Sequence, residues 1–238
     1  MATGFFKKSW ALGLMLILAS TGCAQTQSEA ADPTAPPVEH ASFHQLVFAN
    51  DDFAVLNNRY PPGGDSGFHT HYRDIFYVVI QSAPQSGQRV GQPLTAAPSV
   101  QVGAAGYSAN GEEPRVHRIV NGDEGSSQFI VVELRRPRPR GDAVSTREGP
   151  YVQIVDNERM RAWRLILEPG QSVPSISQGG NGIRVVVRGG LLTTTTAGVP
   201  DQTLFLQTGD FALQSSGSTR ALRNRGTETI ELVELEIK

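Results

Sequence analysis

Two histidines one residue apart, His69 and His71, are the side chains of this sequence best suited to metal chemistry. A glycine-rich turn precedes them, and an aromatic and β-branched run follows. Alternate side chains of a β-strand lie on one face, so both imidazoles can point the same way. Imidazole is the commonest protein ligand of Zn²⁺, Fe²⁺ and related ions. A third histidine, His117, lies on a later strand-like segment, so three of the five histidines form one pattern that suggests a metal site.

The elements that must position these side chains are β-strands. The 238 residues include 25 glycines and 15 prolines, which punctuate many short apolar runs and favour an all-β chain. Residues 182–188, 202–206 and 228–237 are β-branched or alternating and are bounded by turn residues. No segment after the N-terminal region has the apolar period of a helix. The formal net charge of −2 and the lack of a basic stripe argue against a nucleic-acid partner.

The first residues have the pattern of a bacterial export signal. Lys7 and Lys8 supply its positive charge, and residues 10–20 supply an apolar core too short to span a bilayer as a mature helix. The Ser-Thr-Gly-Cys that follows resembles a bacterial lipobox, although serine stands where leucine is usual. Cys23, the only cysteine of the chain, occupies the acylated position. We expect residues 1–22 to be the signal peptide of a lipoprotein that is acylated at Cys23. The alternative is an ordinary secretory signal peptide with an incidental Cys23.

The next segment, residues 23–41, is polar and rich in proline and alanine, so it cannot bury enough apolar surface to fold alone. We expect it to be a flexible tether between a lipid anchor at Cys23 and a folded domain. Ala24 and Gln25 follow the cysteine, without the aspartate that often signals inner-membrane retention. The sequence therefore predicts a periplasmic protein that is lipid-anchored to a membrane, with the outer membrane preferred.

The chain also matches itself, in three places and in the same order along the sequence. The matches pair residues 50–63 with 157–170, residues 129–134 with 230–235, and Gly106, His117 and Asn121 with Gly209, Arg220 and Asn224. None of the three contains a gap, and small loop deletions explain the drift in their offset. We therefore predict a duplicated unit of about 100 residues, with a first barrel at residues 42–136 and a second at residues 147–238. Closing a sheet into a barrel or sandwich would remove most strand edges.

The residues around the histidine pair resemble the first motif of the cupin superfamily, which is a glycine, five residues, His-x-His and a later glutamate. Gly63 stands six residues before His69, and His71 completes the pair. No glutamate lies within reach, but Asp74 stands where the family has its glutamate, three residues before a Tyr-Val-Val run. Aspartate is shorter by a methylene. Asp74 therefore binds the ion directly, binds it through water, or leaves a three-histidine site with open positions.

The second cupin motif is a glycine, five residues, Pro-x-Gly, two residues, a histidine, three residues and an asparagine. Gly106, His117 and Asn121 match it, while Glu112 and Pro114 replace the proline and the second glycine. With the repeat, the resemblance is to a bicupin, and it implies two tandem cupin-type, jelly-roll-like β-barrels. It also implies that the three histidines of the first barrel bind one divalent metal ion, and facial imidazoles plus solvent suit Fe, Mn or Zn.

The second unit has lost every ligand that the resemblance assigns to the first. Ile176 and Gln178 occupy its His-x-His positions, and Arg220 occupies the position of the later histidine. A guanidinium group does not coordinate a metal readily. We therefore expect a metal-free second barrel, either as a structural partner or with Arg220 as a clamp for the carboxylate or phosphate of a ligand.

The cupin resemblance implies a metal-dependent protein of the cell envelope that acts on a small organic molecule. Open metal positions would accept substrate, water or O₂. A dioxygenase-like oxidoreductase is the largest single candidate, because some iron-dependent cupins also lack the glutamate. The alternative is a non-enzymatic bicupin of the envelope, either structural or binding a small ligand, since the fold alone does not choose between them.

Overall fold

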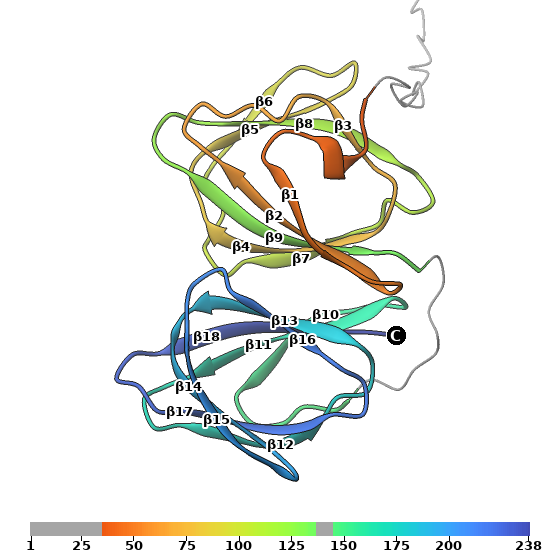
Figure 1. Cartoon of the computed structure of the whole chain (residues 1–238). Coiled ribbons are helices and arrows are strands. Elements are labelled where there is room, and N and C mark those ends of the chain that lie inside the picture. The colour runs from red at the N-terminus through yellow and green to blue at the C-terminus, as the bar shows by residue number, and fades with distance from the viewer. Residues whose placement is uncertain (1–34, 137–144) are drawn as a thin grey trace, which may run out of the picture. The chain divides into compact units, whose positions relative to one another are not determined.

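The computed structural model describes residues 35–136 and 145–238 of the chain (Figure 1). This part of the chain contains eighteen β-strands, one short 3₁₀ helix, η1 (Val38–His40), and no α-helix. None of the helical structure in these residues is long and apolar enough to cross a membrane. The predicted all-β fold is confirmed, because the regular structure of these residues is almost entirely β-strand.

The strands form two barrels of nine strands each. The first contains β1 (His44–Ala49), β2 (Phe53–Tyr60), β3 (His69–His71), β4 (Ile75–Gln81), β5 (Gln85–Arg89), β6 (Thr95–Ala97), β7 (Ala105–Ser108), β8 (Arg115–Asn121) and β9 (Ser127–Leu134). The second contains β10 (Tyr151–Asp156), β11 (Met160–Leu167), β12 (Ser172–Ser177), β13 (Gly182–Arg188), β14 (Gly190–Thr196), β15 (Val199–Leu206), β16 (Phe211–Gln214), β17 (Thr219–Asn224) and β18 (Ile230–Ile237). The three strands expected from sequence near residues 182–188, 202–206 and 228–237 are β13, β15 and β18.

Both barrels have the same strand order (Figure 1). Each consists of a five-stranded and a four-stranded antiparallel sheet. The orders are β1-β2-β9-β4-β7 and β3-β8-β5-β6 in the first barrel, and β10-β11-β18-β13-β16 and β12-β17-β14-β15 in the second. Adding nine to each strand number converts one barrel into the other. The predicted tandem duplication is therefore present in the topology itself.

The five-stranded sheets carry two apolar faces, because successive side chains of a strand point to opposite sides. One face lies between the barrels, where Phe76 of the first packs in the same buried cluster as Ile183 of the second. The other face lines each barrel, with Leu56 in the first interior and Leu165 in the second. Fully burying a side chain of this size contributes about 1.5–3 kcal/mol. The sheet-to-sheet contact is thus part of the hydrophobic core.

A turn at the start of each unit confirms the match of residues 50–63 with 157–170. The side-chain oxygen of Asn50 accepts the backbone N–H groups of the residues two and three positions later, both at 2.9 Å. The side-chain oxygen of Asn157 makes the same two contacts, at 2.9 and 3.0 Å. Each turn leads directly into a long strand of a five-stranded sheet, β2 or β11.

The match of the last strands is wrong by two residues. Asn57 of β2 pairs with Ile130 of β9, and at the same position of the second barrel Arg164 of β11 pairs with Val233 of β18. Ile130 therefore corresponds to Val233. A slip of two residues leaves every side chain on its own face of the sheet, so the apolar alternation of these strands could not reveal it.

The match of Gly106 with Gly209 is also wrong, because Gly103 is the residue that corresponds to Gly209. Gly103 and Gly209 have φ angles of +82° and +88°. Each donates its N–H to a valine carbonyl, that of Val79 or Val186, at 2.8 Å. Gly106 lies within β7 instead. The first barrel has a longer loop between its motif glycine and β8, and that extra length produced the apparent match of Gly106 with Gly209.

The asparagines that end the second motif keep their match. The side-chain amide of Asn121 donates to the carbonyl of Gly125 at 2.7 Å, and that of Asn224 donates to the carbonyl of Glu228 at 2.8 Å. Both asparagines are buried. They close equivalent turns before β9 and β18, which explains why the turn skeleton survives where the histidines do not.

The described end of the predicted tether lies against the first barrel. The backbone N–H of Thr70, in β3, donates to the carbonyl of Pro36 at 2.8 Å, and Pro37 forms a parallel bridge with Thr70. Val38 is 1% exposed and packs in the interior cluster with Leu56. Residues 35–41 therefore belong to the folded barrel and not to a flexible tether, while residues 1–34 lie outside the described residues.

Candidate metal centre

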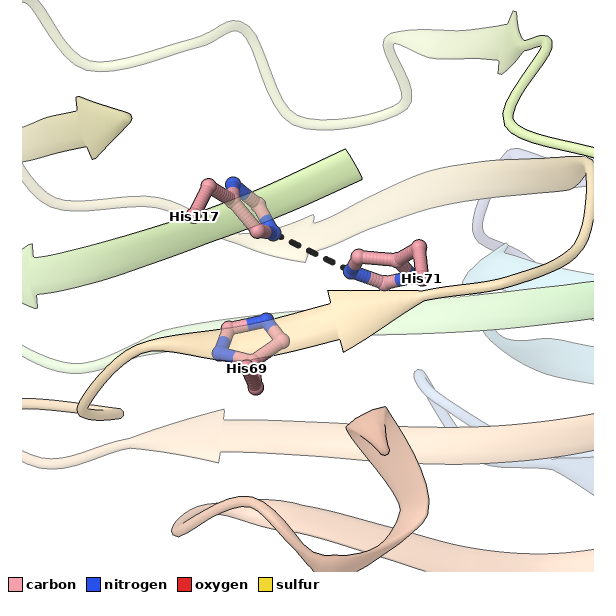
Figure 2. Close-up of side chains that lie close together, drawn as sticks. All are labelled: His69, His71 and His117. Carbon is pink, nitrogen blue, oxygen red and sulfur yellow. Dashed lines mark hydrogen bonds between the residues drawn. The ribbon is translucent and has the colours of Figure 1, made fainter. Parts of the chain in front are cut away.

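The structure brings His69, His71 and His117 together inside the first barrel (Figure 2). His69 and His71 lie on β3, and His117 lies on the neighbouring strand β8. One ring nitrogen from each histidine can be chosen so that all three atoms lie within 4.8 Å of one another. Among the described residues, no other group of histidine, cysteine, aspartate and glutamate side chains meets this condition.

Strand pairing explains why these three side chains converge. His69 and His117 are direct partners in the antiparallel pair β3–β8, and side chains opposite each other in such a pair have Cβ atoms about 4.5–5.5 Å apart. The two-residue period of β3 then puts His71 on the same face as His69. The fold thus supplies two ligands from one strand and one from its neighbour, as the sequence pattern predicted.

Burial keeps the three imidazoles neutral. His69 and His71 are buried, and His117 is half-buried. Removal from water, and to a lesser extent the neighbouring His69, lower the pKa of His71 to about 3. The same two causes, burial first and adjacent histidines second, hold the pKa of His117 below its ordinary value. Because each pKa lies below 7, each ring at neutral pH has a free nitrogen lone pair, as a metal ligand requires.

The orientation of His69 leaves one nitrogen ready for an ion. Its Nδ1 donates to the carbonyl of Gly67 at 3.1 Å, so the lone pair resides on Nε2. That Nε2 is buried and has no hydrogen-bond partner among the described residues. The Nε2 atoms of His71 and His117 lie 3.0 Å apart. A buried, unpartnered acceptor beside two converging imidazole nitrogens fits a metal ion, which would satisfy all three.

Asp74 is not part of this cluster. One oxygen of its carboxylate accepts the backbone N–H groups of Asn110 and Gly111, at 3.0 and 2.8 Å. The other accepts a hydrogen bond from Arg159 at 2.7 Å, and Arg159 belongs to the second barrel. Burial raises the pKa of Asp74, but hydrogen bonds from Tyr107 and these backbone groups and the charge of Arg159 outweigh it and lower the pKa. The expected role of Asp74 as a fourth ligand is therefore not supported, and Asp74 instead ties a loop of the first barrel to the second.

A fourth histidine, His44, contacts the cluster without belonging to it. Its ring lies 4.5 Å from the ring of His69, measured between centroids. Its Nδ1 lies 2.8 Å from the carbonyl of Ser42, and its Nε2 lies 3.0 Å from the hydroxyl of Tyr60. Both nitrogens are thus engaged, Nδ1 as donor and Nε2 as acceptor. Sequence analysis did not find this role, because it depends on the pairing of β1 with β2 and not on a local motif.

The first barrel also contains a buried carboxylic acid, Glu133, that sequence analysis did not single out. Glu133 is 3% exposed. Burial, and to a lesser extent the nearby charge of Glu39, raise its pKa to about 7, although Arg73 and Arg135 act in the opposite direction. The Arg73 guanidinium lies 3.6 Å from its carboxylate. Glu133 can therefore gain or lose a proton near neutral pH.

The second barrel repeats the geometry of the first without its ligands. Ile176 of β12 pairs with Arg220 of β17, in the same place where β3 and β8 pair His69 with His117. Arg220 donates to Gln178 at 3.0 Å and to Glu234 at 3.1 Å, so its guanidinium lies inside the barrel. The predicted replacement of the histidines by isoleucine, glutamine and arginine is thus a replacement at equivalent positions in space.

The sequence matches no protein-family model and no curated protein. Solved structures are similar in fold. AerE from Microcystis aeruginosa has a TM-score of 0.62 at 13% identity, covering 86% of this chain and 97% of AerE. A single-residue mutant of salicylate 1,2-dioxygenase from Pseudoaminobacter salicylatoxidans, in complex with gentisate, has a TM-score of 0.60 at 12% identity, covering 84% of this chain and 76% of the dioxygenase. A cupin 2 conserved barrel domain protein from Leptotrichia buccalis has a TM-score of 0.52 at 10% identity, covering 82% of this chain and 88% of the Leptotrichia protein.

These likenesses and the strand order define the class of fold. The described residues form two tandem cupin-type β-barrels, and the first of them holds a cluster of three histidines, two buried and one half-buried. Identities this low speak for the fold alone.

Proposed function

We propose that this protein is a metal-dependent enzyme whose first barrel binds one divalent ion through His69, His71 and His117. The observation that carries the proposal is the convergence of three neutral imidazoles within 4.8 Å, one of them with a buried and unpartnered Nε2. Three imidazoles on one face leave coordination positions open, and Fe, Mn and Zn all accept such a ligand set. An ion held there would polarise a carbonyl, activate water or, as iron, activate O₂.

We further propose that the substrate is a small organic molecule and that the reaction is a dioxygenase-like oxidation. The proposal is supported by the fold shared with a salicylate dioxygenase that binds gentisate and by a site without a carboxylate ligand. The residues of this chain have distinct tasks in it. Hydrogen bonding to Gly67 orients the His69 ring, and packing by His44 restricts it further.

Elemental analysis of protein purified without a histidine tag tests the metal site. We expect about one equivalent of Fe, Mn or Zn in the wild type and loss of most of it in His69→Ala and His117→Ala. His40→Ala removes an exposed histidine and Arg220→Ala alters the second barrel, so neither should change the metal content. If folded His69→Ala and His117→Ala proteins retain wild-type metal, the proposal is wrong. Oxygen uptake by the iron-loaded protein with gentisate and other small aromatic acids then tests the reaction class.

For the cellular location we propose a periplasmic protein anchored by acylation of Cys23, with the outer membrane preferred. Residues 1–34, including Cys23, lie outside the described residues, so the proposal rests on the lipobox-like sequence. Metabolic labelling with a clickable fatty acid should mark the wild type and not Cys23→Ser. Equal lack of label in both would contradict the anchor.

A further inference from the structure

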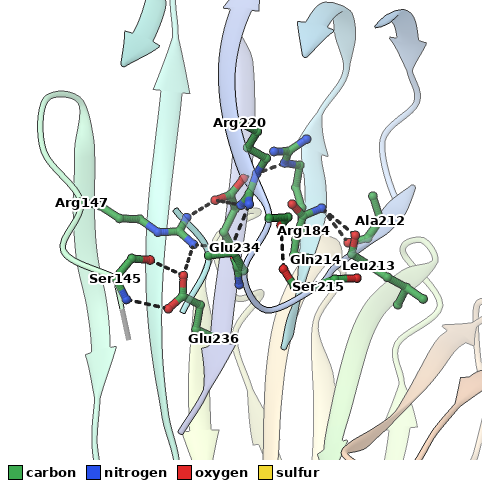
Figure 3. Close-up of polar contacts among 12 residues, drawn as sticks. Ser145, Arg147, Arg184, Ala212, Leu213, Gln214, Ser215, Arg220, Glu234 and Glu236 are labelled. Atoms are coloured by element: carbon green, nitrogen blue, oxygen red, sulfur yellow. Dashed lines mark hydrogen bonds and ion pairs between the residues drawn. The ribbon is translucent and has the colours of Figure 1, made fainter. Parts of the chain in front are cut away.

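The interior of the second barrel contains a cluster of buried charges (Figure 3). Its members are Arg147, Arg184, Arg220, Glu234 and Glu236. All five are buried, and both glutamates are 0% exposed. Three guanidinium groups face two carboxylates, so the cluster has one positive charge in excess. A buried net charge of this kind is costly unless something balances it.

Glu234 cannot supply the missing negative charge, because its carboxylate already serves all three arginines. It accepts hydrogen bonds from Arg184 at 2.6 Å, from Arg220 at 3.1 Å and from Arg147. Glu236 is equally committed, to Arg147 at 3.0 Å and to Ser145. Burial, followed by the charges of Arg184 and Arg147, lowers the pKa of Arg220 despite the attraction of Glu234. The cluster is therefore short of acceptors for its positive charge.

Three donors of the cluster are buried and have no hydrogen-bond partner among the described residues: Nε of Arg147, Nη2 of Arg184 and Nε of Arg220. The last two belong to arginines that line one cavity. Arg184 is 6% exposed and Arg220 is 4% exposed, so water reaches neither group freely. Leaving a buried charged donor unpaired costs more than the 1–3 kcal/mol of a neutral one. An anion beside Arg184 and Arg220 would satisfy the unpaired donors of these two residues and neutralise the excess charge.

The same two arginines line a cavity of about 800 Å³. Its wall also contains the apolar side chains Val186, Leu192 and Leu206 and the hydroxyl of Thr194. This volume lies in the range of small-molecule sites, which combine an apolar wall with a few charged or polar groups. A chloride ion or a water molecule would leave most of the cavity and its apolar wall without contacts.

We propose that the second barrel binds a small organic monocarboxylate, with its carboxylate against Arg184 and Arg220 and its apolar part against Val186, Leu192 and Leu206. Guanidinium groups bind carboxylates with strong charge-assisted hydrogen bonds. One negative charge matches the single excess positive charge of the cluster, whereas the second charge of phosphate would not be balanced. The site does not use the histidines of the first barrel, so carboxylate binding can be tested independently of the metal centre.

Isothermal titration calorimetry with hexanoate tests this assignment. Hexanoate should bind the wild-type protein, whereas 1-hexanol and hexylamine, which lack the carboxylate, should bind at least tenfold more weakly. Inorganic phosphate should also bind at least tenfold more weakly than hexanoate. Binding of phosphate but not hexanoate would overturn the assignment of a carboxylate with an apolar body, and so would equal binding of hexanoate and hexanol.

Two pairs of variants locate the site. Thr194→Trp places a ring in the cavity but leaves every ion pair intact, whereas Thr195→Trp places the same ring on the exposed face of β14. Thr194→Trp should weaken hexanoate binding at least tenfold, and Thr195→Trp should leave it unchanged. Arg220→Gln should also weaken binding, with the exposed Arg188→Gln as its control. Because Arg220→Gln can unfold the barrel, Thr194→Trp is the deciding variant: unchanged affinity there overturns the proposal.

Discussion

The two barrels share a backbone and differ in the chemistry of their interiors. At equivalent positions of the two four-stranded sheets, the first barrel pairs His69 with His117 and the second pairs Ile176 with Arg220. The first interior collects neutral bases and the second collects fixed charges. The strand pairing and the asparagine-closed turns are the same in both. In this protein the barrel thus tolerates opposite polar interiors, and the site residues are not needed to form the fold.

A second pair of positions shows how each interior is balanced. Tyr77 faces Val131 across β4 and β9, and at the same place in the second barrel Arg184 faces Glu234 across β13 and β18. The first barrel needs no carboxylate here, because its histidines are uncharged at neutral pH. The second needs one, because guanidinium groups stay protonated. The arginine at the position of His117 in the second barrel therefore occurs together with a glutamate at the position of Val131, on a strand of the other sheet.

Removing the central carboxylate of the second barrel should have the largest effect on stability. Glu234→Gln leaves three buried guanidinium groups with one carboxylate, so we expect a loss of about 3–5 kcal/mol in the free energy of unfolding. Urea denaturation monitored by circular dichroism measures it. Glu228→Gln, an exposed position shortly before the same strand, is the control and should change stability by less than about 0.5 kcal/mol. Equal effects of the two variants would mean that the buried cluster does not depend on Glu234.

Introducing two interior residues of the second barrel at the equivalent positions of the first gives the sharpest test of the equivalence of the two interiors. His117→Arg should abolish metal binding and cost about 3 kcal/mol, because it buries a cation without a partner. Val131→Glu alone should also destabilise the protein. Together they should form the ion pair that Arg220 and Glu234 form at 3.1 Å. We therefore expect the double variant to recover about 2 kcal/mol relative to the sum of the single variants, while remaining metal-free. Simple additivity would show that the two positions are not in contact.

The two barrels should also respond oppositely to the loss of a carboxylate at a third equivalent position, Glu133 in the first and Glu236 in the second. Burial raises the pKa of Glu133 to about 7, so between about pH 4.5 and 7 the folded chain binds a proton that the unfolded chain has released. Its contribution to stability is present below pH 4.5 and is lost as the pH rises through 7. Glu133→Gln should therefore be more stable than the wild type at pH 8, by about 2 kcal/mol, and nearly equal to it at pH 4. Chemical denaturation at both values measures this.

The corresponding residue of the second barrel provides the contrast. Strand register places Glu236 opposite Arg161 as it places Glu133 opposite Ala54, and Glu236 is paired with Arg147 at 3.0 Å. Glu236→Gln should destabilise the protein at pH 8. If Glu133→Gln also destabilises it at pH 8, the Glu133 carboxylate is balanced by Arg73 and the two interiors are alike at this position.

The sequence was sufficient for the features that local spacing determines. The His-x-His spacing and the repeat led to the correct fold and histidine cluster, although the motif glycine of the first barrel is Gly103 and not Gly106. Asp74 was assigned from its distance to a Tyr-Val-Val run, but the loop around Asn110 and Gly111 captures its carboxylate. His44 and Glu133 could not be found, because long-range strand pairing brings them into the interior. The carboxylate that balances Arg220 was hidden by the two-residue error in the last strand, which aligned Glu234 with Glu133 instead of Val131.

The smallest expected effect concerns a contact that only the first barrel has. The hydroxyl of Tyr60 donates to Nε2 of His44, whose ring packs on His69. The corresponding residue of the second barrel is Leu167, which has no hydroxyl to donate. Tyr60→Phe removes this hydrogen bond, so we expect a loss of about 1 kcal/mol in stability. A looser His69 should also weaken metal affinity by about tenfold, as loss of a supporting contact does in other metal sites.

Metal competition with a fluorescent chelator measures the affinity, and Tyr72→Phe, at an exposed tyrosine, is the control. If Tyr60→Phe lowers stability but leaves metal affinity unchanged, Tyr60 and His44 support packing and do not position the ligand.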